Sequence, residues 1–289
     1  MAPWESGDVQ VNGVRLHYTR TGGAKPPVVL AHGFSDDGLC WTPVAEVLAL
    51  DYDVIMVDAR GHGQSDAPEQ GYTMADMAGD LRGVITELRL YRPTVVGHSM
   101  GGGTALALAG LYPDGPGAIL LEDAAPLGLA AMRMPHDPSR HAGIMERIVR
   151  LQSMPREHLI AEQRAAAPMW SEVALGLWAD AQLRLSPKVT DFDPTVAVDW
   201  PVVLRRIACP ALLIAADPDR GGMISAESAA AFQSFVPRLR VITMAGVGHC
   251  IRYEQFGRYM DVVRGFLAGA SSGVYPRSSA PRPAARAFR

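Results

Sequence analysis

The stretch that decides the fold is Gly97-His98-Ser99-Met100-Gly101. Residues 92–96 before it (Arg-Pro-Thr-Val-Val) are short and β-branched, which predicts a buried strand, and the small residues at 102–109 after it predict a helix. A serine at a sharp strand-to-helix turn has its hydroxyl lifted out of the sheet, and the two glycines leave room for the neighbouring backbone. The pattern therefore predicts Ser99 as a nucleophile.

The same five-residue pattern occurs at 269–273, but there no strand precedes Ser271. We interpret this second match as chance, because only Ser99 has the strand and helix that the motif requires.

Strand-like and helix-like segments alternate along most of the chain, which predicts a mostly parallel, eight-stranded sheet between helices. The predicted strands form a hairpin at 9–19 and lie at 27–31, 52–58, 92–96, 118–121, 211–214 and 239–244. Between Pro126 and Ala208 only helical segments are indicated, at 142–151, 156–166 and 169–185. We therefore expect an α/β core at 1–126 and 209–270, a helical cap at 127–208 inserted after the sixth strand, and a disordered tail at 271–289.

The charge of the chain limits the classes of partner that it is expected to bind. The net charge is −3, and residues 271–289 hold only basic charges, so the body of the chain is more acidic than this number suggests. An acidic body argues against nucleic acid as a partner.

The cysteines, Cys40, Cys209 and Cys250, are widely spaced and odd in number, which favours free thiols in a reducing compartment. With no signal-peptide core and no apolar run of about 18 residues, we expect a cytoplasmic protein without a membrane partner.

A serine hydroxyl needs a general base, and the base needs an orienting carboxylate. His249 follows the last predicted strand in a glycine-containing loop, so it is the predicted base. Asp219 is the preferred acid over Asp217 because it lies deeper in the loop after the 211–214 strand. Asp123, at the end of the sixth strand, is a third candidate.

A tetrahedral intermediate also needs donors for its oxyanion. The backbone N–H of Met100 is one predicted donor, since it opens a helix, and the N–H of Phe34, after Gly33, is the other. His98 adjoins the nucleophile, but neighbours on a tight turn point apart. We therefore expect His98 to shape the pocket floor or to support the catalytic residues from behind.

Together these motifs resemble the α/β-hydrolase superfamily, and within it the branch of capped esterases, C–C hydrolases and cofactor-free haloperoxidases. The resemblance covers roughly residues 10–270. It rests on five motifs: His32-Gly33-Phe34, residues 58–66, residues 97–102, residues 210–214 with Asp217 and Asp219, and Gly248-His249. It implies a Ser-His-Asp hydrolase without a cofactor or metal. Serine at position 99 excludes dehalogenases and epoxide hydrolases, which carry aspartate at this turn. The acid loop departs from the usual pattern at Ala216 and Pro218.

The cap segment supplies Met134, Trp170 and Trp178 as candidate pocket residues. Such a pocket suits small to medium hydrophobic carboxylic esters or lactones, while Asp36 and Asp37 are expected to disfavour anionic substrates. Two alternatives stay open: a C–C bond hydrolase of diketones, which needs a basic residue for the substrate carboxylate, and a non-catalytic small-molecule receptor. No feature of the sequence indicates the oligomeric state.

Overall fold

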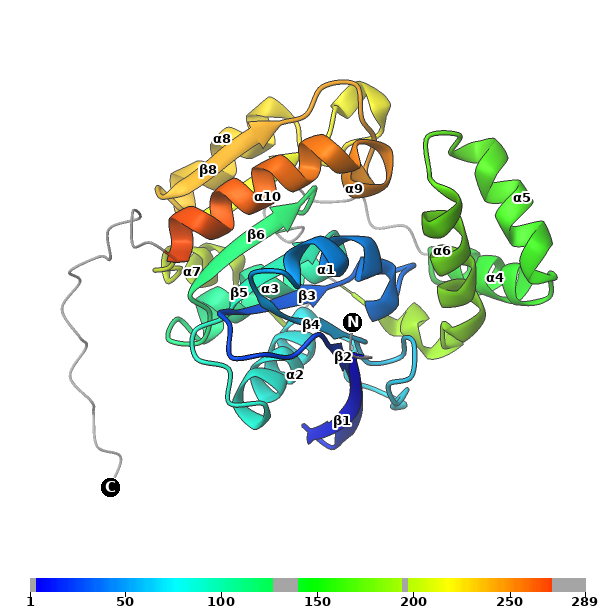
Figure 1. Ribbon diagram of the computed structural model, residues 1–289, viewed down its shortest axis with the longest axis horizontal. Coiled ribbons are helices and arrows are strands. Elements are labelled where there is room, and N and C mark those ends of the chain that lie inside the picture. The colour runs from blue at the N-terminus through cyan, green and yellow to red at the C-terminus, as the bar shows by residue number, and fades with distance from the viewer. Residues whose placement is uncertain (1–3, 127–139, 194–196, 272–289) are drawn as a thin grey trace.

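The computed structural model describes residues 4–126, 140–193 and 197–271, and its centre is an eight-stranded sheet between helices (Figure 1). The strands are β1 (Glu5–Val11), β2 (Val14–Arg20), β3 (Pro27–Ala31), β4 (Asp53–Val57), β5 (Thr94–His98), β6 (Ala118–Glu122), β7 (Ala211–Ala215) and β8 (Leu239–Thr243). Their order across the sheet is β1-β2-β4-β3-β5-β6-β7-β8. The β1–β2 and β2–β4 pairs are antiparallel and all other pairs are parallel. This confirms the predicted fold class.

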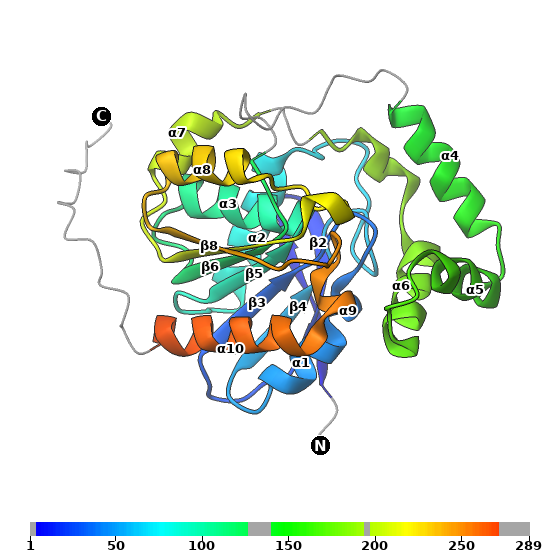
Figure 2. The same cartoon turned by 90° about the horizontal axis from the view of Figure 1, so that it is seen from above.

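Helices cover both faces of the sheet (Figure 2). The helices of one face are α2 (Met74–Glu87), α3 (Met100–Leu111), α7 (Trp200–Arg205) and α8 (Ala226–Phe235). Those of the other face are α1 (Thr42–Leu48), α9 (Ile251–Glu254) and α10 (Phe256–Ser271). Each face has its own apolar cluster, and β4, β6 and β7 are buried along their whole length. Strands buried on both faces explain the continuous apolar runs in the sequence.

Three helices between β6 and β7 stand apart from these two layers (Figures 1 and 2). They are α4 (Arg140–Gln152), α5 (Arg156–Ala166) and α6 (Glu172–Arg184), and a small apolar cluster that includes Leu159 and Trp178 joins them. Short 3-10 turns within the described residues are η1 (Gly38–Trp41), η3 (Pro187–Asp191) and η4 (Pro218–Arg220). A helical segment therefore follows the sixth strand as predicted. The proposed domain boundaries remain predictions.

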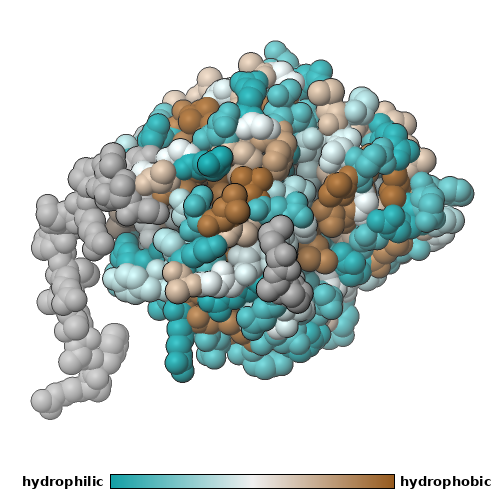
Figure 3. Space-filling view, in the orientation of Figure 1, coloured by the Kyte–Doolittle hydropathy of each residue, from teal (hydrophilic) through white to brown (hydrophobic). Residues whose placement is uncertain are grey.

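On the face shown in Figure 3, hydrophobic residues form small patches separated by hydrophilic ones. Within the described ranges, no helix combines the length and apolar character needed to cross a bilayer.

The first turn of α3 lies against the ends of β3 and β5. A Cβ added at Gly101 would lie 2.2 Å from the carbonyl oxygen of Ala31 and 2.7 Å from that of His32. At Gly97 it would lie 2.3 Å from the carbonyl oxygen of Gly101. These neighbours are backbone atoms and cannot rotate away, so only glycine fits at both positions.

We predict that Gly101→Ala lowers the free energy of unfolding by about 1–3 kcal/mol, because the helix must shift away from β3. Gly265→Ala is the matched control: it lies inside α10, where an added Cβ meets nothing within 4 Å. That substitution should raise stability by about 0.5–1 kcal/mol. Urea denaturation of the three proteins measures both effects, and equal stability of Gly101→Ala and wild type would contradict the close packing.

Candidate functional site

Ser99 occupies the turn between β5 and α3 in a strained conformation. Its φ of 51° and ψ of −112° lie outside the regions that non-glycine residues normally adopt. Its amide donates to the carbonyl oxygen of Glu122 at 3.0 Å, and its own carbonyl accepts from Gly103 N at 3.0 Å. Its side-chain hydroxyl makes no hydrogen bond to a described residue, which leaves Oγ free for a substrate. Strain of this kind concentrates at functional positions.

His249 lies beside this turn. Its ring packs on that of His98 with 4.7 Å between centroids, so the predicted base adjoins the residue before Ser99. Its Nδ1 lies 2.7 Å from Oδ2 of Asp123. Because a carboxylate oxygen can only accept, Nδ1 carries the hydrogen, so the lone pair of the neutral ring is on Nε2. A base in this tautomer is ready to take a proton through Nε2.

Asp123 is fully buried and firmly held. Its Oδ1 accepts from Ala216 N at 3.1 Å, and its Oδ2 accepts from Met223 N at 2.9 Å as well as from His249. Its φ of 41° makes it a second strained residue, at the end of the strand next to β5. These contacts fix the carboxylate, and through it the ring of His249.

The preference for Asp219 as the partner of His249 is therefore wrong in this structure. Pro218 begins the turn η4, which leaves Asp219 exposed at the surface, while its amide donates to Oδ1 of Asp217 at 3.0 Å. Oδ2 of Asp217 accepts from Gly246 N at 2.8 Å. Asp217 thus braces the loop that carries His249, and the third candidate, Asp123, makes the contact.

The predicted oxyanion donors lie on two facing segments. Met100 is the first residue of α3, where the helix leaves its amide unpaired. Phe34 lies in the loop at 32–37, which turns through a bond from Asp36 N to the Gly33 carbonyl oxygen at 3.1 Å. Neither the Met100 nor the Phe34 amide donates to any described residue. A Cβ at Gly33 would lie 2.5 Å from Nδ1 of His98, so glycine lets the loop approach β5.

Two neutral histidines support this loop. His32 accepts from Ala59 N through Nε2 at 3.0 Å and donates from Nδ1 to the Gly33 carbonyl oxygen at 2.8 Å. Burial lowers its pKa to about 4, which matches this neutral tautomer. Burial likewise lowers the pKa of His62 to about 4. Its Nδ1 and Nε2 each lie 2.9 Å from a carbonyl oxygen, of Arg60 and of Phe34, so both ring nitrogens are engaged and His62 supports the loop.

The remaining predicted pocket residues fall into different roles. His98 is buried, and its Nε2 donates to the carbonyl oxygen of His249 at 3.2 Å, so it packs behind the base. Trp178 is buried among the α4–α6 helices and contributes packing. Trp170 contacts Tyr253, with 4.4 Å between ring centroids, and so extends over the segment after His249. Met134 lies outside the described residues.

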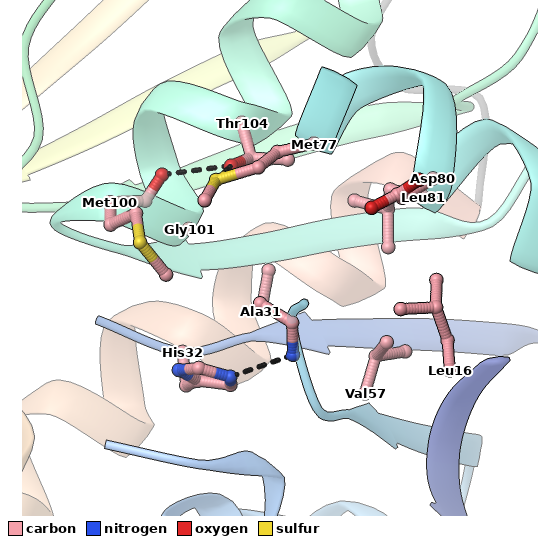
Figure 4. A pocket seen from close by; sticks show the side chains of 11 residues that line it. Leu16, Ala31, His32, Val57, Met77, Asp80, Leu81, Met100, Gly101 and Thr104 are labelled. Carbon is pink, nitrogen blue, oxygen red and sulfur yellow. Dashed lines mark hydrogen bonds between the residues drawn. The ribbon is translucent and has the colours of Figure 1, made fainter. Parts of the chain in front are cut away.

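A small cavity lies beneath the turn, between the sheet and the helices α2 and α3 (Figure 4). Met77, Met100 and Thr104 line one side, and Ala31 and Val57 line the other. Its volume of about 30 Å³ has room for a water molecule but not for a substrate. It is therefore not the substrate pocket.

The N-terminal hairpin contains a second Ser-His-Asp arrangement. Oγ of Ser6 lies 3.0 Å from Nε2 of His17, whose Nδ1 lies 2.9 Å from Oδ1 of Asp8. Ser6 lies inside the β1–β2 ladder, opposite Thr19, without a glycine turn or a helix N-terminus beside it. Because Ser6 lies in a regular ladder and not at a strand-to-helix turn, we keep Ser99 as the candidate nucleophile.

Within the described ranges, no group of three or more His, Cys, Asp or Glu side chains is placed to hold a metal ion.

Comparison with known proteins gives the family of the chain. Residues 28–262 match the alpha/beta hydrolase family. An uncharacterized protein of Mycobacterium tuberculosis is 39% identical over 104 residues, which is 36% of this chain and only 30% of that protein. The N-formylmaleamate deformylase of Pseudomonas putida is 28% identical over 265 residues, covering 90% of this chain and 96% of that enzyme.

The crystal structure of E-2-(acetamidomethylene)succinate hydrolase has a TM-score of 0.76 at 22% identity, covering 92% of this chain and 99% of that one. At this identity the likeness concerns the fold alone. The family match at residues 28–262 spans the strands β3 to β8, the Ser99 turn and the loop of His249, and on this basis the chain belongs to the alpha/beta hydrolase family.

Proposed function

We propose that this protein is a serine hydrolase that cleaves carboxylic esters or lactones of small to medium size through an acyl-enzyme. The observation that carries the proposal is the bond from His249 Nδ1 to the buried carboxylate of Asp123, at 2.7 Å, with the ring packed beside the Ser99 turn. This arrangement supplies a nucleophile, a base and an orienting acid.

The reaction follows from these positions. Nε2 of His249 takes the proton of Ser99 as Oγ attacks the substrate carbonyl carbon, and Asp123 stabilises the imidazolium. The negative charge on the carbonyl oxygen is stabilised by the amides of Phe34 and Met100. The leaving alcohol takes the proton from His249, and water then repeats the sequence to release the acid. No cofactor takes part in these steps.

The charge around the site bears on the substrate. Asp36 and Asp37 were expected to disfavour anionic substrates, but both side chains are buried. Asp36 is paired with Arg252 and Asp37 is paired with Arg184, so neither carboxylate is free to repel an anion. On α4, by contrast, Nη1 of Arg147 lies 3.4 Å from Oγ of Ser35, next to the amide donor Phe34. Among the described residues no carboxylate pairs with Arg147.

Arg147 favours a second candidate, hydrolysis of a substrate that carries a carboxylate. Its side chain is exposed, and desolvation and the neighbouring Arg150 lower its pKa while Glu162 raises it. The relative from Pseudomonas putida is named for removing a formyl group from N-formylmaleamate, an anion. Cleavage of an amide or of a C–C bond in a carboxylate-bearing substrate would use the same Ser99 chemistry.

The non-catalytic small-molecule receptor is the remaining alternative. Multiple turnovers of a short p-nitrophenyl ester would exclude it.

We predict that Ser99→Ala abolishes both hydrolysis of a short p-nitrophenyl ester and covalent labelling by a fluorophosphonate. Only a hydroxyl is lost from a turn built by glycines, so the melting temperature should stay close to that of wild type. Mass spectrometry of the labelled protein identifies the modified residue. Labelling at Ser6 or Ser271 instead would contradict the proposal.

Asp123→Asn should lower kcat by about 10⁴-fold, because an amide favours the wrong imidazole tautomer and does not stabilise the imidazolium. Asp219→Asn, the matched control, should keep kcat within about twofold, since the Asp219 side chain is exposed. Steady-state kinetics on one ester measures both variants. An active Asp123→Asn enzyme with a crippled Asp219→Asn enzyme would restore the original assignment.

For the anionic substrate, Arg147→Gln should raise KM for a carboxylate-bearing ester about tenfold or more, the effect of losing a hydrogen bond to a charged group. KM for a neutral ester of similar size should not change. Arg150→Gln is the control on the same helix, because Arg150 is paired with Glu162 at 2.8 Å. Equal losses for charged and neutral esters would show that Arg147 does not bind the carboxylate.

A further inference from the structure

Arg252 lies at the centre of a buried ionic cluster directly behind the site. Its side chain is almost fully buried. Nη1 donates to Oε2 of Glu122 at 3.1 Å, Nη2 donates to Oδ2 of Asp36, and its backbone amide donates to Oε1 of Glu122 at 2.9 Å. Its guanidinium carbon also lies over the rings of Trp41 and Tyr253, at 4.3 and 4.2 Å. The guanidinium is therefore held by carboxylates at its ends and by aromatic rings at its face.

Each partner of Arg252 is close in sequence to a residue of the site. Glu122 directly precedes Asp123, and its carbonyl oxygen accepts from Ser99 N at 3.0 Å. Asp36 lies two residues after Phe34, and its amide closes the turn of the 32–37 loop. Arg252 itself lies three residues after His249. One side chain thus joins the segments that supply the acid, the base and an oxyanion donor.

His98 adds a second connection between the same segments. Its Nδ1 lies 3.8 Å from Oδ2 of Asp36, and its Nε2 donates to the carbonyl oxygen of His249. Burial, with the nearby charge of Arg252, lowers the pKa of His98 well below its usual value, so the ring stays neutral. It fills the space between the cluster and His249 without adding a charge.

The cluster is poorly explained by stability alone. Burying charges carries a large desolvation cost, and apolar residues of similar volume often stabilise a protein equally well. What a guanidinium that bridges two carboxylates adds is direction, because its planar fork sets their relative positions. We therefore expect the loss of Arg252 to change the relative positions of the segments around it more than the overall stability.

We propose that Arg252 is a positioning residue: it holds the segments of Phe34, Asp123 and His249 in the relative placement that the reaction of Ser99 requires. The inference rests on the proposed function. Arg252 does not touch the substrate, so its loss should lower kcat while leaving KM nearly unchanged. Misplacement of catalytic groups by about 1 Å costs up to about 100-fold in rate.

The test compares Arg252→Lys with wild type in three measurements: the rate of Ser99 labelling by a fluorophosphonate, kcat and KM for a short p-nitrophenyl ester, and the melting temperature. Lysine keeps the charge but cannot hold both carboxylates in a fixed plane. We expect labelling and kcat to fall about 10- to 100-fold, with KM within about twofold of wild type.

Arg20→Lys is the matched control. Arg20 grips the buried carboxylate of Asp53 through Nε and Nη2, at 3.0 and 2.6 Å from Oδ2, at the opposite end of the strands. It should lower the melting temperature without changing the labelling rate. If the two lysine variants lose rate equally, the effect of Arg252 is a general loss of stability and the proposal is overturned.

A second variant covers the case in which Arg252→Lys does not fold. Arg252→Met combined with Glu122→Gln and Asp36→Asn removes all three charges together, so no unpaired buried charge remains. It should fold and show the same loss of kcat and labelling. If the triple variant reacts as fast as the wild type, the positioning role is overturned and the proposed function stands. If the wild-type protein itself is not labelled at Ser99, the proposed function is overturned as well.

Discussion

The contact between the first turn of α3 and the ends of β3 and β5 is the constraint on which the site depends. Only hydrogen atoms fit at Gly97 and Gly101, because backbone carbonyl groups lie where a Cβ would be. The same contact brings the amide of Met100 toward the 32–37 loop and holds Ser99 at a φ of 51°. Such a conformation costs about 1–3 kcal/mol, which the packing of β5 and α3, both buried over most of their length, offsets.

The parallel register then brings the other groups to the same edge. His98 pairs with Glu122 across β5 and β6, so Ser99 and Asp123 leave the sheet at the same level and side by side. Both have a positive φ. The loop after β8 returns over this edge, braced by Asp217, and sets His249 against Asp123. The candidate site is thus a product of strand order.

Formal charge along the sequence is a poor guide to the electrostatics of this edge. Asp36, Asp37 and Glu122 are all buried, and each pairs with an arginine from a distant segment. The guanidinium of Arg147 is accessible near the amide of Phe34. Asp36, Asp37 and Glu122 therefore offer no free carboxylate to a substrate, because each is paired with an arginine.

Local patterns in the sequence determined the fold class, the Ser99 turn and the position of His249, since glycine spacing and strand–helix alternation depend on neighbouring residues. The predicted helix and strand bounds agree with the structure to within a few residues for most elements. The turn η1 is a short 3-10 segment that hydropathy does not distinguish from the helix α1 after it.

The choice among Asp123, Asp217 and Asp219 could not be made from local patterns, because each follows a predicted strand. Only the tertiary structure decided it: β6 lies next to β5, whereas η4 directs Asp219 into solvent. The ion pairs of Asp36 and Asp37 were equally hidden, since their partners lie 216 and 147 residues away and meet them only through packing.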